Sequence, residues 1–127
     1  MDKRIIVIDD QIDIRNAFKL ALEDTGIDVA TAESGSEGIK SIQENSYDLV
    51  YLDLKMPGMN GIETLQAIRK ISNIIPVYII TAFHGEFMDG LVEAQQKGYE
   101  FELLKKPLEM DEIRQITLGI LNGPTSY

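Results

Sequence analysis

The chain has 127 residues, a formal net charge of −9 at pH 7 and no cysteine. A chain of this length forms one domain with its own core, and the acidic charge argues against direct binding of nucleic acid, which needs a positive face. Disulfides and thiolate metal sites are excluded, the apolar run near the start is too short for a signal peptide, and no stretch approaches the ~20 apolar residues of a membrane span, so we expect a soluble, cytoplasmic domain.

The first third of the chain predicts two strands that alternate with helices. Residues 5–8 are all apolar and lead into Asp9-Asp10, which indicates a buried strand with two carboxylates at its carboxyl end. Apolar side chains at helical spacing follow, and Gly26 is expected to end this first helix. Residues 27–31 alternate apolar and polar side chains, as a second strand does.

A second helix and a third strand come next. Ser34 and Glu37 have the spacing of a capping box that opens the helix. The short apolar run at residues 49–52 is typical of a strand covered on both faces, and it ends at Asp53. Because ligands of open α/β sheets bind beyond the carboxyl ends of the strands, Asp53 lies where chemistry is expected.

The loop Met56-Pro57-Gly58 then breaks regular structure. Asn60 and Glu63 predict a second capping box, which opens a third amphipathic helix. Residues 77–80 form a further apolar run, and we expect a fourth strand there.

The last third of the chain continues the alternation. A fourth helix is predicted to begin near Gly85 and to stop at Gly98. Its inward residues are expected to be Phe87, Met88, Leu91 and Val92. Residues 101–104 predict a fifth strand, and a last amphipathic helix is expected to end at Asn122.

Five strands that alternate with five helices favour a parallel sheet with right-handed crossovers. The expected fold is therefore α/β: a (βα)5 doubly wound parallel five-stranded sheet in the order 2-1-3-4-5, the flavodoxin-like arrangement. All carboxyl ends of such a sheet meet at one edge. Four of the strands lead into polar groups, namely Asp9-Asp10, Asp53, Thr81 and Lys106.

These polar side chains are predicted to converge into one site. Three carboxylates in one crevice raise one another's pKa unless a cation lies among them. Only oxygen ligands are on offer, which implies a hard ion, and Mg²⁺ suits best because it keeps several waters and often binds phosphate oxygens. Thr81 supplies a hydroxyl and Lys106 a positive charge, both typical partners of phosphate. The set indicates a Mg²⁺-assisted phosphoryl site with Asp53 as the candidate nucleophile.

Each of these residues also has an ordinary structural explanation. An Asp pair often caps a helix, a Thr at a strand end favours the strand itself, and a Lys beside a Pro is usually a solvated turn residue. Their joint occurrence at the ends of four separate strands favours the functional interpretation. His84 has no such support, and we expect an exposed loop residue there.

At these positions the chain resembles the receiver domain of bacterial two-component response regulators. The resemblance assigns residues 1–122 to the receiver domain and 123–127 to a C-terminal tail or the start of a linker. It is carried by Asp9-Asp10, the stretch from Leu52 to Gly61, Thr81-Ala82 and Lys106-Pro107.

The resemblance implies that Asp53 accepts a phosphoryl group from a phosphohistidine on a histidine kinase or a histidine phosphotransfer protein. It implies that Asp10, Asp53 and the backbone carbonyl of Lys55 bind Mg²⁺ directly, and that Asp9 acts largely through water. A signalling role follows, in which the domain catalyses only its own phosphorylation and the slow loss of that group.

Thr81 and Lys106 would then couple the added charge to a movement of the face formed by the fourth helix, fifth strand and fifth helix. An output domain or a partner protein would respond at that face. The resemblance further implies a monomer or a phosphorylation-dependent dimer, and a cis peptide bond at Lys106-Pro107.

The sequence departs from the family pattern on the same face. Three positions before the lysine, where the family usually has an aromatic switch residue, this chain has Leu103. Phe101 would serve instead if the fifth strand carried a bulge. Lys55 and Phe83 occupy positions at which the family tunes phosphoryl lifetime, and we hypothesise that these bulky side chains restrict attack by water.

Three other functions stay open on the sequence. A Mg²⁺-dependent phosphatase of the haloacid-dehalogenase kind also uses an Asp nucleophile, but it normally has a second Asp two residues later, where this chain has Lys55. A flavodoxin-like cofactor module needs a Ser/Thr/Gly-rich loop after the first strand, where this chain has Asp9-Asp10-Gln11-Ile12. The intact acidic site argues against a receiver-like binding module that is never phosphorylated.

Overall fold

The computed structural model describes residues 2–82 and 85–122. Its five strands form one sheet in which every neighbouring pair is parallel, in the order β2-β1-β3-β4-β5. The strands are β1 (Arg4–Ile8), β2 (Asp28–Ala32), β3 (Leu49–Asp53), β4 (Val77–Thr81) and β5 (Glu102–Lys105). The predicted α/β doubly wound fold and its strand order are therefore confirmed.

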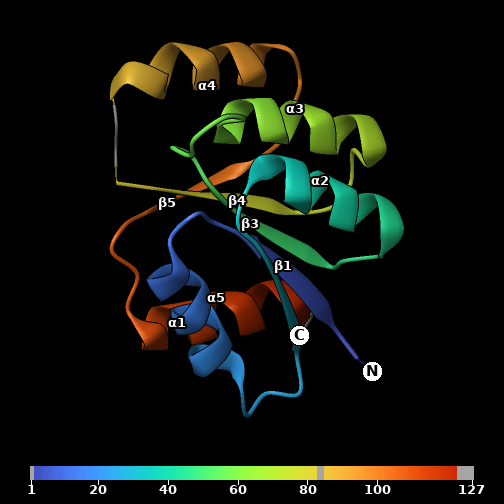
Figure 1. The fold of residues 1–127 in the computed structure, drawn as a ribbon, viewed down its shortest axis with the longest axis vertical. Helices are drawn as coiled ribbons and strands as arrows, with labels where there is room; N and C mark the ends of the chain where they lie inside the picture. The colour runs from blue at the N-terminus through green and yellow to red at the C-terminus, as the bar shows by residue number, and fades with distance from the viewer. Residues whose placement is uncertain (1, 83–84, 123–127) are drawn as a thin grey trace, which may run out of the picture.

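Helices cover both faces of the sheet, with α1 and α5 on one side and α2, α3 and α4 on the other (Figure 1). The helices are α1 (Ile12–Leu22), α2 (Gly35–Glu44), α3 (Gly61–Ile71), α4 (Met88–Gln96) and α5 (Met110–Asn122), and a 3₁₀ turn (Gly85–Phe87) precedes α4. Within the described part of the chain, no helix is long and apolar enough to cross a membrane.

Each face of the sheet has its own apolar core. Ile6 and Ile8 of β1 belong to the cluster on the α2–α4 side, whereas Ile5 and Val7 belong to the cluster on the α1–α5 side. The four side chains are at most 1 % exposed. A strand that is apolar on both faces can be buried only between two layers of helices, which explains why residues 5–8 lack alternation.

The start of α3 is anchored to the end of β3. The Glu63 N–H donates to Asn60 Oδ1 at 2.9 Å and the Asn60 N–H donates to the Glu63 carboxylate at 3.0 Å, so the predicted capping box is confirmed. The Gly61 N–H donates to the Leu54 carbonyl at 2.8 Å. A Cβ atom at Gly61 would lie 2.5 Å from the carbonyl oxygen of Asp53, so this close approach requires glycine.

The first helix ends earlier than predicted. α1 stops at Leu22, and Gly26, with φ of +79°, lies in the turn that follows. The hydroxyl and the N–H of Thr25 both donate to the Leu22 carbonyl, at 2.6 and 3.1 Å. This local side-chain bond replaces the continuing helical hydrogen bond and turns the chain before the glycine.

Only one of the two hydrogen bonds of the capping box predicted for α2 is present. Ser34 Oγ accepts the Glu37 N–H at 3.2 Å, as expected. The Glu37 carboxylate, however, accepts the N–H of Glu33 at 3.3 Å rather than that of Ser34. The side chain thus reaches back four residues rather than three, and it secures the loop before the helix.

The inward face predicted for the α4 region is confirmed in part: Leu91 is buried, and Phe87 is half-buried against the core cluster on the α2–α4 side. Met88 and Val92 are 40 % and 44 % exposed, whereas Leu91 and Ala94 are buried. A Cβ atom at Gly90 would lie 2.5 Å from the Ile62 side chain of α3. The small residues on α4 allow this close packing against α3 and turn the larger apolar side chains toward solvent.

The fifth strand pairs with β4 in regular register from Tyr78↔Glu102 to Thr81↔Lys105, so it contains no bulge. Phe101 lies just before β5, half-buried against the core cluster on the α2–α4 side. Leu103 is 48 % exposed. The bulge that would have made Phe101 a substitute switch residue is therefore not formed.

One buried polar pair ties β3 to α5. The Tyr51 hydroxyl and the Thr117 hydroxyl lie 2.7 Å apart, both side chains are fully buried, and the Tyr51 ring packs on Phe18 with centroids 4.7 Å apart. We expect Tyr51→Phe to lower the free energy of unfolding by about 1–2 kcal/mol, because it leaves a buried hydroxyl without its partner. Urea unfolding followed by circular dichroism measures this change.

A double-mutant cycle tests whether the loss of stability comes from the hydroxyl pair of Tyr51 and Thr117. The variant Tyr51→Phe/Thr117→Val removes both hydroxyls and should recover most of the lost stability. Tyr78→Phe, on the neighbouring strand, serves as the matched control. Additive losses in the double variant would contradict the pairing.

Candidate functional site at the carboxyl edge of the sheet

Three carboxylates meet at the carboxyl ends of β1 and β3. Asp9 directly follows β1, and Asp53 is the last residue of β3, which pairs with β1 through Ile8↔Leu52. Asp9, Asp10 and Asp53 each place one carboxylate oxygen within 4.8 Å of the others. The convergence predicted from the sequence is therefore found for all three.

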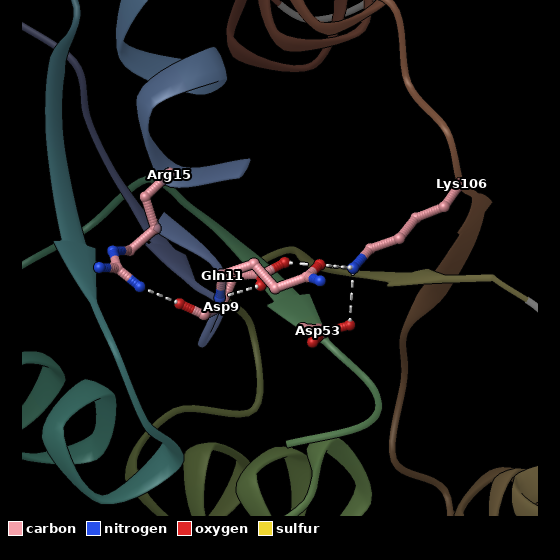
Figure 2. A network of polar contacts seen from close by, with 5 residues as sticks. All are labelled: Asp9, Gln11, Arg15, Asp53 and Lys106. Carbon is pink, nitrogen blue, oxygen red and sulfur yellow. Dashed lines mark hydrogen bonds and ion pairs between the residues drawn. The ribbon is translucent and has the colours of Figure 1, made fainter. Parts of the chain in front are cut away.

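The ammonium group of Lys106 lies beside these carboxylates. Its Nζ is 3.1 Å from Asp53 Oδ1 and 3.4 Å from Asp9 Oδ2 (Figure 2). The Lys106 N–H donates to the Thr81 carbonyl at 2.7 Å, which fixes the end of β5 beside β4. The Lys106–Pro107 peptide bond is cis, as predicted.

Two of the three carboxylates are buried, and Lys106 only partly offsets their negative charge. Asp9 is 1 % and Asp53 5 % exposed, whereas Asp10 is exposed. Burial raises the pKa of the Asp53 carboxyl to about 6, the charge of Asp9 adds to this rise, and Lys106 opposes it. Burial also raises the pKa of Asp9, against the opposing effects of the Gln11 N–H and Lys106. A site of this kind favours the binding of a cation.

Two residues that were not predicted as site residues hold Asp9 in place. The Gln11 N–H donates to Asp9 Oδ1 at 2.9 Å, and Arg15 Nη1 donates to the Asp9 carbonyl at 2.8 Å. Arg15 also lies 3.8 Å from the Glu33 carboxylate beyond β2. Arg15 gave no signal, because an arginine on an amphipathic helix is usually solvated; Gln11 gave a weak one, as an uncommon residue at a helix N-terminus.

A cleft of about 500 Å³ opens over this cluster. Its lining residues are Asp10, Gln11, Asp53, Lys55, Met56, Pro57, Ala82 and Lys106. Thr81 ends β4 at the same edge and is 8 % exposed, so Ala82 rather than Thr81 lines the opening. The structure thus brings the three carboxylates and Lys106 together, and Thr81 lies buried at the carboxyl end of β4.

The family model described as the response regulator receiver domain matches residues 5–118. The chain belongs to this family. As a receiver domain it is a phosphorelay signalling module of the two-component type, and this membership favours the receiver over the phosphatase and the flavodoxin-like alternatives.

Relatives and solved structures agree with the assignment. The receiver is 45 % identical over 89 residues, 70 % of the chain, to a transcriptional regulatory protein CpxR homolog of Haemophilus influenzae. It is similar to the chemotaxis protein CheY4 of Vibrio cholerae (TM-score 0.81, 25 % identity, 94 % of this chain and 99 % of that one). It is also similar to the response regulator TrrA of Thermotoga maritima in complex with Mg²⁺-BeF (TM-score 0.75, 30 % identity, 93 % and 98 %).

The receiver corresponds to only part of its curated relatives. It spans 38 % of the length of the CpxR homolog and about a quarter of the length of ZraR from Klebsiella oxytoca. The similarity therefore concerns only a part of each of these proteins.

Lys55, which lines the cleft, forms an ion pair with Glu86. Lys55 Nζ, in the loop after β3, lies 3.5 Å from Glu86 Oε1 in the 3₁₀ turn before α4, and both side chains are exposed. The pair joins the loop after β3 to the turn that precedes α4. Phe83, the second residue expected to restrict water, and His84 lie outside the described residues.

Proposed function

We propose that Asp53 is the phosphoacceptor of this receiver and takes its phosphoryl group from a phosphohistidine on a histidine kinase or a histidine phosphotransfer protein. The observation that carries the proposal is the cluster itself, in which Asp53 opens onto the cleft with Asp9, Asp10 and Lys106 around it. Family membership supports it further.

The chemistry follows from the atoms present. A carboxylate oxygen of Asp53 forms a bond to phosphorus while the bond from phosphorus to the donor imidazole nitrogen breaks. The leaving nitrogen keeps the electron pair and then takes up a proton from water. With a pKa of about 6, Asp53 is mostly ionised above pH 7 and can attack. The Lys106 ammonium, 3.1 Å from Oδ1, offsets the negative charge that the product adds.

The donor set fits Mg²⁺, because all its ligands are oxygens and three carboxylates lie within 4.8 Å of one another. We propose that Asp10, Asp53 and the Lys55 carbonyl bind the ion directly, and that Asp9 acts through water. The bound ion supplies positive charge next to the phosphoryl oxygens. The Mg²⁺-BeF complex of TrrA supports this assignment by similarity.

The output is proposed to arise at the α4–β5–α5 face. Phosphorylation adds charge beside Lys106, and Lys106 and Thr81 are linked through their backbones at the ends of β5 and β4. Exposed apolar side chains at Met88, Val92 and Leu103 give this face a surface for an output domain or a partner protein. The oligomeric state proposed for the protein is a monomer or a phosphorylation-dependent dimer.

The test is exposure of the protein to acetyl phosphate and Mg²⁺, followed by intact-mass and peptide mass spectrometry. We expect one phosphoryl adduct, located on the peptide that contains Asp53 and dependent on Mg²⁺. An adduct on another residue would overturn the assignment of Asp53, and no adduct at all would favour a receiver that is never phosphorylated. Sustained turnover of phosphomonoesters would instead favour the phosphatase alternative.

A further inference from the structure

Gln11 is placed at the N-terminal cap of α1 but does not cap it. The helix begins at Ile12, and the Gln11 side chain makes no capping hydrogen bond. Its carboxamide oxygen instead lies 3.4 Å from Lys106 Nζ, in the cleft (Figure 2). Glutamine is not among the residues that cap helices well, so the missing bond is expected. The contact with Lys106 is the feature of this side chain that calls for an explanation.

The ammonium of Lys106 is fully engaged before any phosphoryl group arrives. It has three N–H donors, and three acceptors surround it: Asp53 Oδ1 at 3.1 Å, Asp9 Oδ2 at 3.4 Å and Gln11 Oε1 at 3.4 Å. A phosphoryl oxygen on Asp53 must displace one of them. The Gln11 carbonyl is the neutral acceptor of the three, so it is the one that is given up at least cost.

The contact with Lys106 also fixes the orientation of the carboxamide. An ammonium can only donate, so the atom of Gln11 that faces it must be the oxygen. The amide nitrogen, which carries two N–H donors, is the other atom of the carboxamide. The Gln11 side chain lines the cleft together with Asp53. Because Gln11 and Asp53 line the same cleft, these two donors are available to a group carried by Asp53.

We propose that Gln11 is a phosphoryl-contacting residue of this receiver: its amide donates to an oxygen of the group carried by Asp53, and its carbonyl holds Lys106 in place beforehand. The proposal rests on the proposed function of Asp53. It assigns the residue after the Asp pair a role in recognising the phosphoryl group, separate from metal binding.

Beryllofluoride, a mimic of the phosphoryl group, tests this role without turnover. The measurements are the Mg²⁺ affinity of the free protein and the beryllofluoride affinity at saturating Mg²⁺, both from nuclear magnetic resonance titrations. For Gln11→Leu we expect a beryllofluoride affinity about tenfold lower, the worth of one charge-assisted hydrogen bond. Its Mg²⁺ affinity should stay within about twofold of wild type, because Gln11 is not a ligand of the ion. The exposed Gln115→Leu on α5 is the matched control and should change neither value.

The side-chain amide signal of Gln11, identified by its loss in Gln11→Leu, gives a direct readout. It should move when beryllofluoride is added and stay in place with Mg²⁺ alone. Wild-type beryllofluoride affinity in Gln11→Leu, or an equal loss of Mg²⁺ affinity, would overturn the role of Gln11 while leaving Asp53 as acceptor. Asp53→Asn is the reference that should not bind beryllofluoride. If wild type also failed to bind it, the proposed function and this inference would both be overturned.

Discussion

Asp53→Asn should abolish the phosphoryl adduct and, in metal-free buffer at pH 7.5, raise the free energy of unfolding by about 2–3 kcal/mol. The adduct is lost because an amide cannot attack phosphorus as a carboxylate does. The protein gains stability because the Asp53 carboxyl is 5 % exposed and has its pKa raised to about 6 by burial and by Asp9. Its ionisation in the folded state is therefore costly, and asparagine removes that cost.

The gain depends on pH in a defined direction. The pKa of Asp53 is higher in the folded chain, about 6, than its ordinary value of 3.8, so the folded state binds the proton more tightly. This contribution to stability is fully present below about pH 4 and is lost as the pH rises through 6. The difference between the variant and wild type should accordingly be small near pH 4 and reach its full size above pH 6.

Urea unfolding in the presence of a chelator, at pH 4.5 and 7.5, measures both quantities. The exposed Asp2→Asn is the matched control, and it should stay within about 0.5 kcal/mol of wild type at both values. Added Mg²⁺ should stabilise wild type more than Asp53→Asn and so reduce the gap between them. A variant less stable than wild type without metal would show that Asp53 is not electrostatically strained.

Lys106→Met should have the opposite effect and lower the free energy of unfolding by about 2–4 kcal/mol at pH 7.5. Methionine keeps the apolar stem but removes the ammonium that lies 3.1 Å from Asp53 and 3.4 Å from Asp9. Two buried carboxylates then lose their nearest positive charge. The same variant should accumulate little phosphoryl adduct, because nothing replaces the charge that offsets the product.

The pH dependence separates this electrostatic loss from a packing defect. Without Lys106 the folded-state pKa values of Asp9 and Asp53 rise further, so the cost is present above them and shrinks as the pH falls and the carboxyls take up protons. The neighbouring exposed Lys105→Met should cost less than about 0.5 kcal/mol. A loss that persists unchanged at pH 4.5 would point to packing instead.

The fold and much of the site were predictable because the information is local. An apolar run such as residues 49–52 can be buried only in a two-sided sheet, and the polar residue that ends it must then lie at the carboxyl edge. The same argument placed the three carboxylates and Lys106 together, as found. Whether Asp53 performs the chemistry assigned to it stays a prediction.

What the sequence could not give depends on packing between distant segments. Met88 and Val92 have the spacing of an inward face, but Gly90 and Ala94 decide which side of α4 approaches α3. Arg15 donates to the backbone carbonyl of Asp9. Every residue has such a carbonyl, so the amino-acid sequence does not indicate this contact.

The close approach of Gly61 to Asp53 divides the molecule into a part that must stay constant and a part that is free to vary. Any side chain added at Gly61 would push directly on the peptide of the acceptor strand, so the first turn of α3 has little room for change during evolution or redesign. The exposed side of α4, with Met88 and Val92, makes no comparable close contact with the acceptor strand. New specificities can therefore accumulate there while the acid cluster keeps its geometry.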